Sequence, residues 1–208
     1  HICYGYCVSD GSLFALKSEL SYLWTVNIGM ALENIRKWQW INRMNEKINR
    51  MWKYDMLTQV LNRSGFFYCA ETILQKIKEE KSNAFIIFLD IDGLKSVNDN
   101  LGHEIGDAFI AKIAGILKEV VPKDCLIMRY GGDEFVVFGS CKQAGRMQRI
   151  AEDIKAAIKT ADQKENRSYH LAASLGCSLH KSYEMDNLNS LIELADKKMY
   201  EEKKNKRR

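Results

Sequence analysis

Long apolar segments are missing from this chain of 208 residues, although 46% of its residues are hydrophobic. A helix that crosses a bilayer needs about 20 consecutive apolar residues, and no run in the sequence approaches that length. No signal peptide is visible either. The sequence therefore predicts a cytoplasmic protein with no membrane segment in this chain, and it is long enough to bury one full core.

Paired cysteines are also missing. The six cysteines, at positions 3, 7, 69, 125, 141 and 177, form no CxxC pair. Such spacings suit neither a zinc site nor a disulfide-stapled secreted scaffold, so we expect reduced thiols. The net charge of +4 is modest, and aromatic residues do not interleave with the basic ones. We therefore expect no nucleic-acid partner.

The acidic residues stand where strand-like segments end. Residues 126–130 and 135–138 are rich in β-branched and aromatic side chains and flank Gly131-Gly132-Asp133-Glu134, a pattern that predicts a hairpin with two acids at its turn. Upstream, the unbroken apolar run Phe85–Leu89 leads directly into Asp90-Ile91-Asp92. The lack of alternation predicts a central strand that is buried on both faces.

This arrangement indicates a metal site. If the strand that ends at Asp90 lies beside the hairpin, Asp90 and Asp133 come together, and two like charges at close range need an offsetting cation. Carboxylates and a backbone carbonyl, such as that of Ile91, are hard oxygen ligands. They suit Mg²⁺, with Mn²⁺ as an alternative, better than zinc.

Further motifs surround these acids in a fixed order. They are DID at 90–92, Lys95, ND at 98–99, GHEIGD at 102–107 and RYGGDEF at 129–135. Others are DMLTQVLNR at 55–63, Ala195-Asp196, Met199-Tyr200, Lys203 and Arg207. Together they resemble the GGDEF family, the diguanylate cyclases, over residues 51–208. The motifs occur in the same order as in the family, which makes the probability of a chance match very small.

The resemblance implies the ferredoxin-like palm of nucleotidyl cyclases. We expect an α+β fold with a mixed, largely antiparallel central sheet surrounded by helices and preceded by a long helix. The apolar patterns predict helices near 64–80, 108–120, 142–160 and 188–203 and a further strand near 170–179.

The resemblance also implies an activity, the condensation of two GTP molecules into cyclic di-GMP with release of pyrophosphate. Mg²⁺ would be held by Asp90, the carbonyl of Ile91 and Asp133. The proton acceptor would be Asp133 or Glu134, of which the family position favours Asp133. Because one monomer presents one GTP, catalysis would require a homodimer.

The resemblance assigns the remaining residues to the nucleotide. Asn98 and Asp107 would bind the guanine edge, and His103 either completes that pocket or packs at a helix entry. The residues expected near the phosphates or the turn are Gly93, Leu94, Lys95, Gly131, Lys203 and Arg207. Asn98 and Asp107 alone do not distinguish guanine from adenine at one half-site.

Departures from the family pattern keep one alternative open. Gln59 replaces a glycine, and Pro122 and Cys125 occupy the two positions of the RxxD product-inhibition motif, so we expect an enzyme without this feedback. The alternative is a catalytically silent GTP-binding domain that acts as a signalling or interaction module. The presence of Asp90, Asp133 and Glu134 argues against silence.

An apolar stripe precedes the motifs. Its members recur at steps of three and four residues and are Leu32, Ile35, Trp38, Ile41, Met44, Ile48 and Met51. This spacing predicts a parallel coiled coil between two copies, with packing of one helix on its own domain as the alternative. We divide the chain into residues 1–50, a signalling helix after the end of an upstream sensor region, and the cyclase domain 51–208. Residues 1–31 resemble the terminal helix of a GAF-type module.

Overall fold

The computed structural model describes residues 18–164, 169–181 and 188–206. By internal contacts the chain divides into two compact units, residues 1–50 and 51–208. Much of the segment 1–31, for which a GAF-type origin was predicted, lies outside the described residues, and that origin stays a prediction. No helix in the described ranges combines the length and the apolar character that a membrane span requires.

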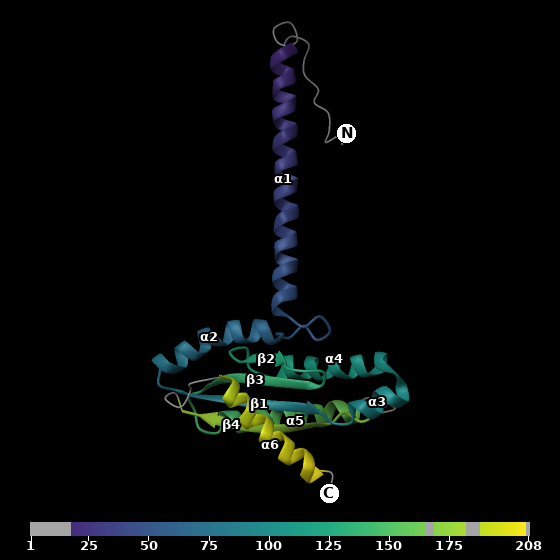
Figure 1. The fold of residues 1–208 in the computed structure, drawn as a ribbon, viewed down its shortest axis with the longest axis vertical. Coiled ribbons are helices and arrows are strands. Elements are labelled where there is room, and N and C mark those ends of the chain that lie inside the picture. The colour runs from purple at the N-terminus through teal and green to yellow at the C-terminus, as the bar shows by residue number, and fades with distance from the viewer. Residues whose placement is uncertain (1–17, 165–168, 182–187, 207–208) are drawn as a thin grey trace. The chain divides into compact units, whose positions relative to one another are not determined.

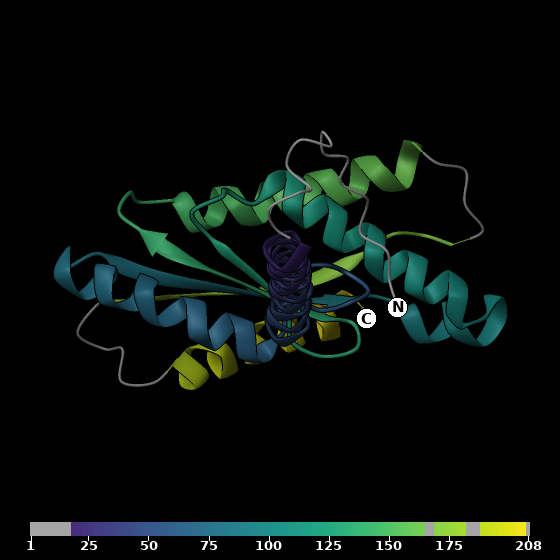
Figure 2. The ribbon, with the colours of Figure 1, turned by 90° about the horizontal axis from the view of Figure 1, so that it is seen from above.

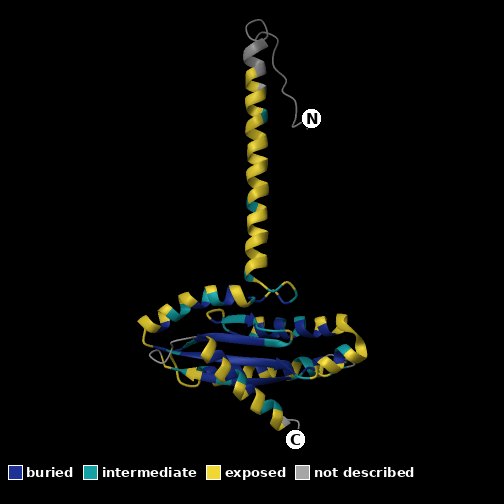
Figure 3. Ribbon diagram, in the orientation of Figure 1, coloured by how far each residue is buried: buried dark blue, intermediate teal, exposed yellow. Residues whose placement is uncertain are grey.

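The long helix α1 (Ser18–Lys53) accounts for the described part of the first unit. Its predicted apolar stripe lies on the surface, as the exposed colouring in Figure 3 shows. The seven stripe side chains, from Leu32 to Met51, have exposed fractions between 36% and 65%. A helix with so much apolar surface in the single chain has a face available for a partner.

The second unit is built on a four-stranded antiparallel sheet. The strands, in the order β2-β3-β1-β4, are β1 (Asn83–Ile91), β2 (Leu126–Arg129), β3 (Glu134–Cys141) and β4 (Ala173–His180). All three neighbouring pairs run antiparallel. The predicted α+β class is confirmed; the four strands pair only antiparallel, and an isolated parallel bridge joins Leu61 to Met128 of β2.

Helices cover both faces of this sheet, as Figures 1 and 2 show. One face packs on α4 (His103–Val120) and α5 (Arg146–Lys164), and the other on α2 (Arg63–Glu79) and α6 (Leu188–Lys206). Phe85, Ile87 and Leu89 of β1 belong to the first core, whereas Ile86 and Phe88 belong to the second. Burial on both faces is the reason that this strand is apolar without alternation.

Two helices differ from the sequence prediction. Helix α3 (Leu94–Leu101) lies in a segment for which the sequence predicts no helix, and α4 begins at His103 rather than near Ala108. Leu94 and Val97 are both buried and stand three residues apart, which is a helical spacing. Because the residues around them are polar, the apolar face of this helix was not recognised in the sequence. Gly102, with φ of 88°, separates the two helices, because a left-handed φ does not continue a helix.

The remaining boundaries differ by a few residues. Helix α2 matches the prediction, and the side chain of Asn62 caps it by accepting a hydrogen bond from the N–H of Gly65. Helix α5 begins at Arg146 rather than near Lys142, because Gly145 adopts a φ of 78°. The last helix continues beyond Lys203, within the described residues, to position 206.

Candidate functional site

The end of β1 lies beside the turn between β2 and β3. Asp90 is the register partner of Glu134, and the N–H of Ile91 donates to the carbonyl of Asp133 at 3.0 Å. The turn itself is closed by the N–H of Tyr130, which donates to the carbonyl of Glu134 at 2.8 Å. The sheet thus brings Asp90 together with Asp133 and Glu134, which lie 43 and 44 positions further along the sequence.

Asp90 faces helix α6. Its position in the alternation of β1 is that of Ile86 and Phe88, whose side chains pack on the α2 and α6 side. There its carboxylate forms an ion pair with Lys203 of α6. Burial raises the pKa of Asp90 above its ordinary value, Lys203 opposes that shift, and the charge of Asp133 adds to it.

Glu134 stands on the same face. Burial raises the pKa of Glu134, and the nearby charges of Asp133, Asp90 and Asp196 raise it further. Its carboxylate lies over Gly131, where an added Cβ would come within 2.5 Å of Oε2. A side chain at position 131 would therefore displace Glu134, which is a physical reason for glycine at this point of the turn.

The donor set fits a divalent ion of the magnesium type. The described residues contain no group of three or more acidic, histidine or cysteine side chains that could hold a metal by themselves. The protein's share would therefore be the carboxylates of Asp90 and Asp133 and the Ile91 carbonyl. Mg²⁺ commonly keeps waters and substrate phosphates as its other ligands. In the structure, the Lys203 ammonium provides a positive charge beside Asp90.

The predicted guanine residues lie on α3 and α4. Asn98 packs against Gly106, where an added Cβ would fall 1.8 Å from the Asn98 Oδ1 atom. This Oδ1 is buried and has no hydrogen-bond partner among the described residues. A buried acceptor without a donor costs free energy, so it marks a place where a ligand N–H would be stabilising. Asp107 and His103 are both exposed near the start of α4.

The residues expected near the phosphates are only partly brought together. Gly93 precedes α3 with φ of 79°, Leu94 is buried, and Lys95 is exposed. Lys203 lies at the acid cluster, on α6. Arg207 lies outside the described residues.

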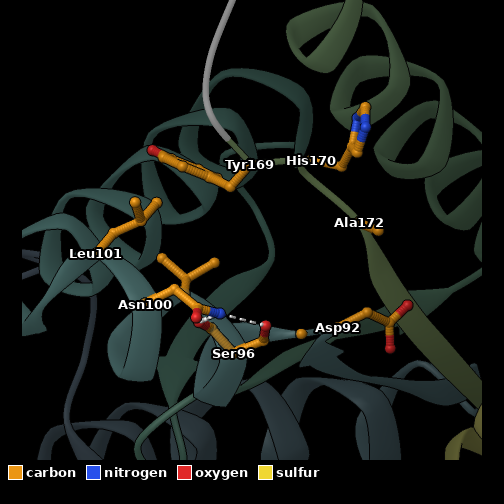
Figure 4. Close-up of a pocket in the computed structure, with 9 residues that line it drawn as sticks. Asp92, Ser96, Asn100, Leu101, Tyr169, His170 and Ala172 are labelled. Carbon is orange, nitrogen blue, oxygen red and sulfur yellow. Dashed lines mark hydrogen bonds between the residues drawn. The ribbon is translucent and has the colours of Figure 1, made fainter.

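A separate hollow of about 540 Å³ lies on another face of α3, between that helix and the segment before β4 (Figure 4). Its lining includes Asp92, Ser96, Asn100 and Tyr169, and the amide of Asn100 donates to the Ser96 hydroxyl at 3.1 Å. Of the predicted site residues only Gly93 lines it. The hollow is therefore distinct from the acid cluster.

Sequence reasoning assigned no role to two polar groups at this edge. The hydroxyl of Ser174, on β4, donates to both carboxylate oxygens of Asp92 at 2.8 and 3.1 Å. Arg129, at the end of β2, bonds both to Asp55 and to the carbonyl of Gly132. Arg129 and Asp55 each stand inside a motif, RYGGDEF and DMLTQVLNR, but the spacing along the chain gives no sign that they meet.

The RxxD positions lie at the opposite end of the hairpin. Cys125 is buried, and burial raises the pKa of its thiol to about 11. The neighbouring Asp124 is held by Arg146, whose Nη2 donates to both carboxylate oxygens at 2.6 and 2.7 Å. These groups therefore satisfy one another within the protein.

Known proteins match this chain over most of its length. Diguanylate cyclase A from Treponema denticola is 29% identical over 199 residues, which cover 94% of this chain and 53% of that protein. The diguanylate cyclase VdcA from Vibrio cholerae is 32% identical over 168 residues, 78% of this chain and 48% of that protein. The chain thus spans about half the length of these curated relatives.

A solved structure supports the fold. The coiled coil and GGDEF domain of DgcB from Caulobacter crescentus, in complex with c-di-GMP, superposes with a TM-score of 0.75 and 23% identity, covering 85% of this chain and 94% of that one. The family model described as diguanylate cyclase, GGDEF domain, matches residues 52–208. The sheet with its acid-bearing turn therefore belongs to a known group, and the chain is a member of the GGDEF family of diguanylate cyclases.

Proposed function

We propose that this protein condenses two GTP molecules into cyclic di-GMP. The observation that carries the proposal is the convergence of Asp90, Asp133 and Glu134 at two neighbouring strand ends. In the reaction the 3′-hydroxyl of each GTP attacks the α-phosphate of the other. Two phosphodiester bonds form, and two pyrophosphates leave.

The acids would act on the attacking hydroxyl. A divalent ion bound by Asp90, the Ile91 carbonyl and Asp133 supplies charge stabilisation for the attacking and leaving oxygens. Asp133 accepts the hydroxyl proton, with Glu134 as the second candidate for this role. The raised pKa of Glu134 supports a carboxylate that can hold a proton at this edge.

The polar groups of α3, α4 and α6 would bind the nucleotide. The buried Asn98 Oδ1 accepts an N–H of guanine, and Asp107 accepts a second one. Lys203 and Lys95, with the backbone of Gly93 and Leu94 and with Arg207, bind the phosphates. Lys203 exchanges Asp90 for a phosphate oxygen when the nucleotide arrives.

Two copies of the chain would complete the reaction. Each copy holds one GTP, so the two acid-bearing edges must face each other. The apolar stripe of α1 supports pairing through this helix, because seven large apolar side chains at coiled-coil spacing are exposed in the single chain. We infer a homodimer through the N-terminal helix.

Product inhibition through the RxxD site would be absent. Pro122 and Cys125 stand at its two positions, and the neighbouring Asp124 is already engaged by Arg146. Neither replacement offers the guanidinium or the carboxylate that such a site uses. The enzyme would therefore not be inhibited by its product at this surface.

Incubating the full chain with Mg²⁺ and with GTP, ATP or both, followed by mass analysis, tests the proposal. We expect cyclic di-GMP from GTP alone, a specific rate that rises with protein concentration as dimers form, and no loss of rate when cyclic di-GMP is added. GTP binding without any product would instead support the silent signalling domain. A mixed dinucleotide would show that one half-site accepts adenine.

A further inference from the structure

A single side chain joins the acid-bearing turn to the segment that follows α1. Arg129 Nη1 donates to Asp55 Oδ1 and Oδ2 at 3.1 and 3.2 Å. The same guanidinium donates through Nε and Nη2 to the carbonyl of Gly132 at 3.2 and 2.8 Å. Asp55 and Arg129 are 74 positions apart in the sequence, so only the fold makes this bridge.

The bridge fixes one side of Asp133. The peptide unit between Gly132 and Asp133 is planar, so holding the Gly132 carbonyl also fixes the direction of the Asp133 N–H. On the other side, the Asp133 carbonyl accepts from the N–H of Ile91 at 3.0 Å. With both adjoining peptides held, the orientation of the Asp133 side chain depends chiefly on its own rotamer.

The other end of the bridge is rigid as well. Asp55 accepts hydrogen bonds from the N–H and the hydroxyl of Thr58 at 2.9 and 2.6 Å. Burial would raise the pKa of Asp55, but these bonds and Arg129 bring it below its ordinary value, which indicates a stabilised carboxylate. Leu61 continues this turn onto β2, since its N–H donates to the Ile127 carbonyl at 3.0 Å.

The end of α1 is fastened to the same turn. The Asn62 side-chain amide donates to the carbonyls of Met51, Trp52 and Tyr54, at 3.3, 2.9 and 3.4 Å. Carbonyls at the end of a helix lack intrahelical partners, so Asn62 caps α1 while its oxygen caps α2. At Gly65 an added Cβ would lie 2.2 Å from the Lys53 carbonyl oxygen, so the backbones of Gly65 and Lys53 are too close for a side chain at position 65.

We propose that Arg129 is a positioning residue for Asp133, and that Asp55 and Arg129 transmit displacements of the C-terminal end of α1 to the acid-bearing turn. The side chain does not touch the reacting atoms. Arg129 orients the turn only while its guanidinium is hydrogen-bonded to Asp55. The rate of the reaction would therefore depend on the position of the Met51–Asp55 segment. The inference rests on the proposed cyclase activity.

The opposite end of the hairpin offers a matched control. Arg146 and Asp124 form another arginine–aspartate pair, at the shorter distances of 2.6 and 2.7 Å, and Arg146 also bonds to the Ser140 carbonyl at 2.8 Å. This pair is remote from the turn along both strands, because Asp124 precedes β2 and Ser140 lies near the end of β3. It is an ion pair of the same kind without a turn to position.

The test compares Arg129→Lys and Asp55→Asn with Arg146→Lys and Asp124→Asn, all in the full chain. Lysine keeps the charge but cannot bond to Asp55 and Gly132 at once in the planar fork of arginine. We expect Arg129→Lys to lower kcat about 10- to 100-fold with KM for GTP within about twofold. Asp55→Asn should lower kcat about tenfold, and the double variant should be no worse than Arg129→Lys alone, because the two residues act as one unit.

Amide hydrogen exchange provides a readout that does not need activity. The Ile91 N–H is held by the Asp133 carbonyl, so its exchange should accelerate about tenfold in Arg129→Lys and Asp55→Asn but not in the Arg146 and Asp124 variants. Unchanged exchange at Ile91, or an equal loss of kcat in both pairs, would overturn the inference. If the wild-type chain makes no product, the proposed function fails, and the exchange comparison alone decides whether the turn is clamped.

Discussion

The pKa values of the acidic side chains are shifted in opposite directions at the two ends of the β2–β3 hairpin. At the open end Arg146 lowers the pKa of Asp124 by direct hydrogen bonds, and the buried Cys125 stays a neutral thiol. At the turn end burial and mutual repulsion raise the pKa values of Glu134 and Asp90, with Lys203 as the partly compensating cation. One end is electrostatically satisfied, and the other holds negative charge that a ligand can neutralise.

This contrast separates structural from functional ionisable groups within one hairpin. Like charges that burial has partly desolvated reduce stability, and proteins retain them mainly where they act on a ligand. The arginine–aspartate pair at the open end includes none of the predicted site residues. Substitutions at the two ends should therefore have different effects on rate, metal binding and stability.

The largest difference should appear in the rate. Asp133→Asn removes a charged metal ligand and the favoured proton acceptor, so we expect cyclic di-GMP formation to fall at least about 100-fold. Asp124→Asn makes the same chemical change at the open end and should alter the rate less than about twofold. Initial rates at saturating GTP measure both variants. Equal losses would remove the functional distinction between the two ends.

A smaller effect concerns metal binding without nucleotide. The Lys203 ammonium forms an ion pair with Asp90, so we expect it to compete with a divalent ion for this carboxylate. Lys203→Met should therefore tighten Mn²⁺ binding in the absence of GTP, by roughly tenfold, a typical size for coupling between two bound groups. Electron paramagnetic resonance titration with Mn²⁺ measures the free ion directly.

The control is Lys204→Met, which changes the adjacent residue of the same helix. Lys204 is exposed and lies over the ring of Tyr200, 4.4 Å from its centroid. Its loss should leave Mn²⁺ affinity unchanged. Weaker Mn²⁺ binding in Lys203→Met would mean that Lys203 assists the ion rather than competing with it.

The smallest effect should be on stability, with opposite signs at the two ends. Above its ordinary pKa of 3.8, ionised Asp124 stabilises the fold, and this contribution is lost as the pH falls through its lowered folded pKa. Asp124→Asn should thus reduce the free energy of unfolding at pH 7 by about 0.5 kcal/mol, as partly exposed pairs do. Below that lowered pKa the difference should vanish.

Glu134→Gln should act in the reverse direction. The folded pKa of Glu134 lies above its ordinary value of 4.5, so its ionisation destabilises the fold fully above the raised pKa and not at all well below 4.5. The variant should gain about 0.5 kcal/mol at pH 7 in metal-free buffer, after allowance for solvent screening. Urea unfolding at pH 7 and pH 3.5 measures Glu134→Gln, and for Asp124→Asn the same measurement follows the decline of the difference as the pH falls from 7. A loss of stability in Glu134→Gln at pH 7 would contradict the electrostatic contrast.

Local patterns in the sequence were sufficient for the strands, the hairpin and most helices. The unbroken apolar run before Asp90 indicated a strand buried on both faces, because burial leaves a mark within a few residues of the chain. Helix α3 was missed because only Leu94 and Val97 carry its apolar face, amid polar neighbours. The family motifs predicted the acid cluster, whose roles stay predictions.

The amino-acid sequence by itself determined the membership of the chain in its family, the positions of the strands along the chain and the types of residue at the acid-bearing turn. Only the tertiary structure decided which cation faces Asp90, that the Asn98 acceptor is buried, and that Asp55 reaches the turn through Arg129. The physical reason is the difference in sequence separation between the two kinds of interaction. Hydrophobic periodicity and turn chemistry act between neighbours in the chain, whereas these contacts join residues 74 and 113 positions apart, which meet only after the sheet has formed.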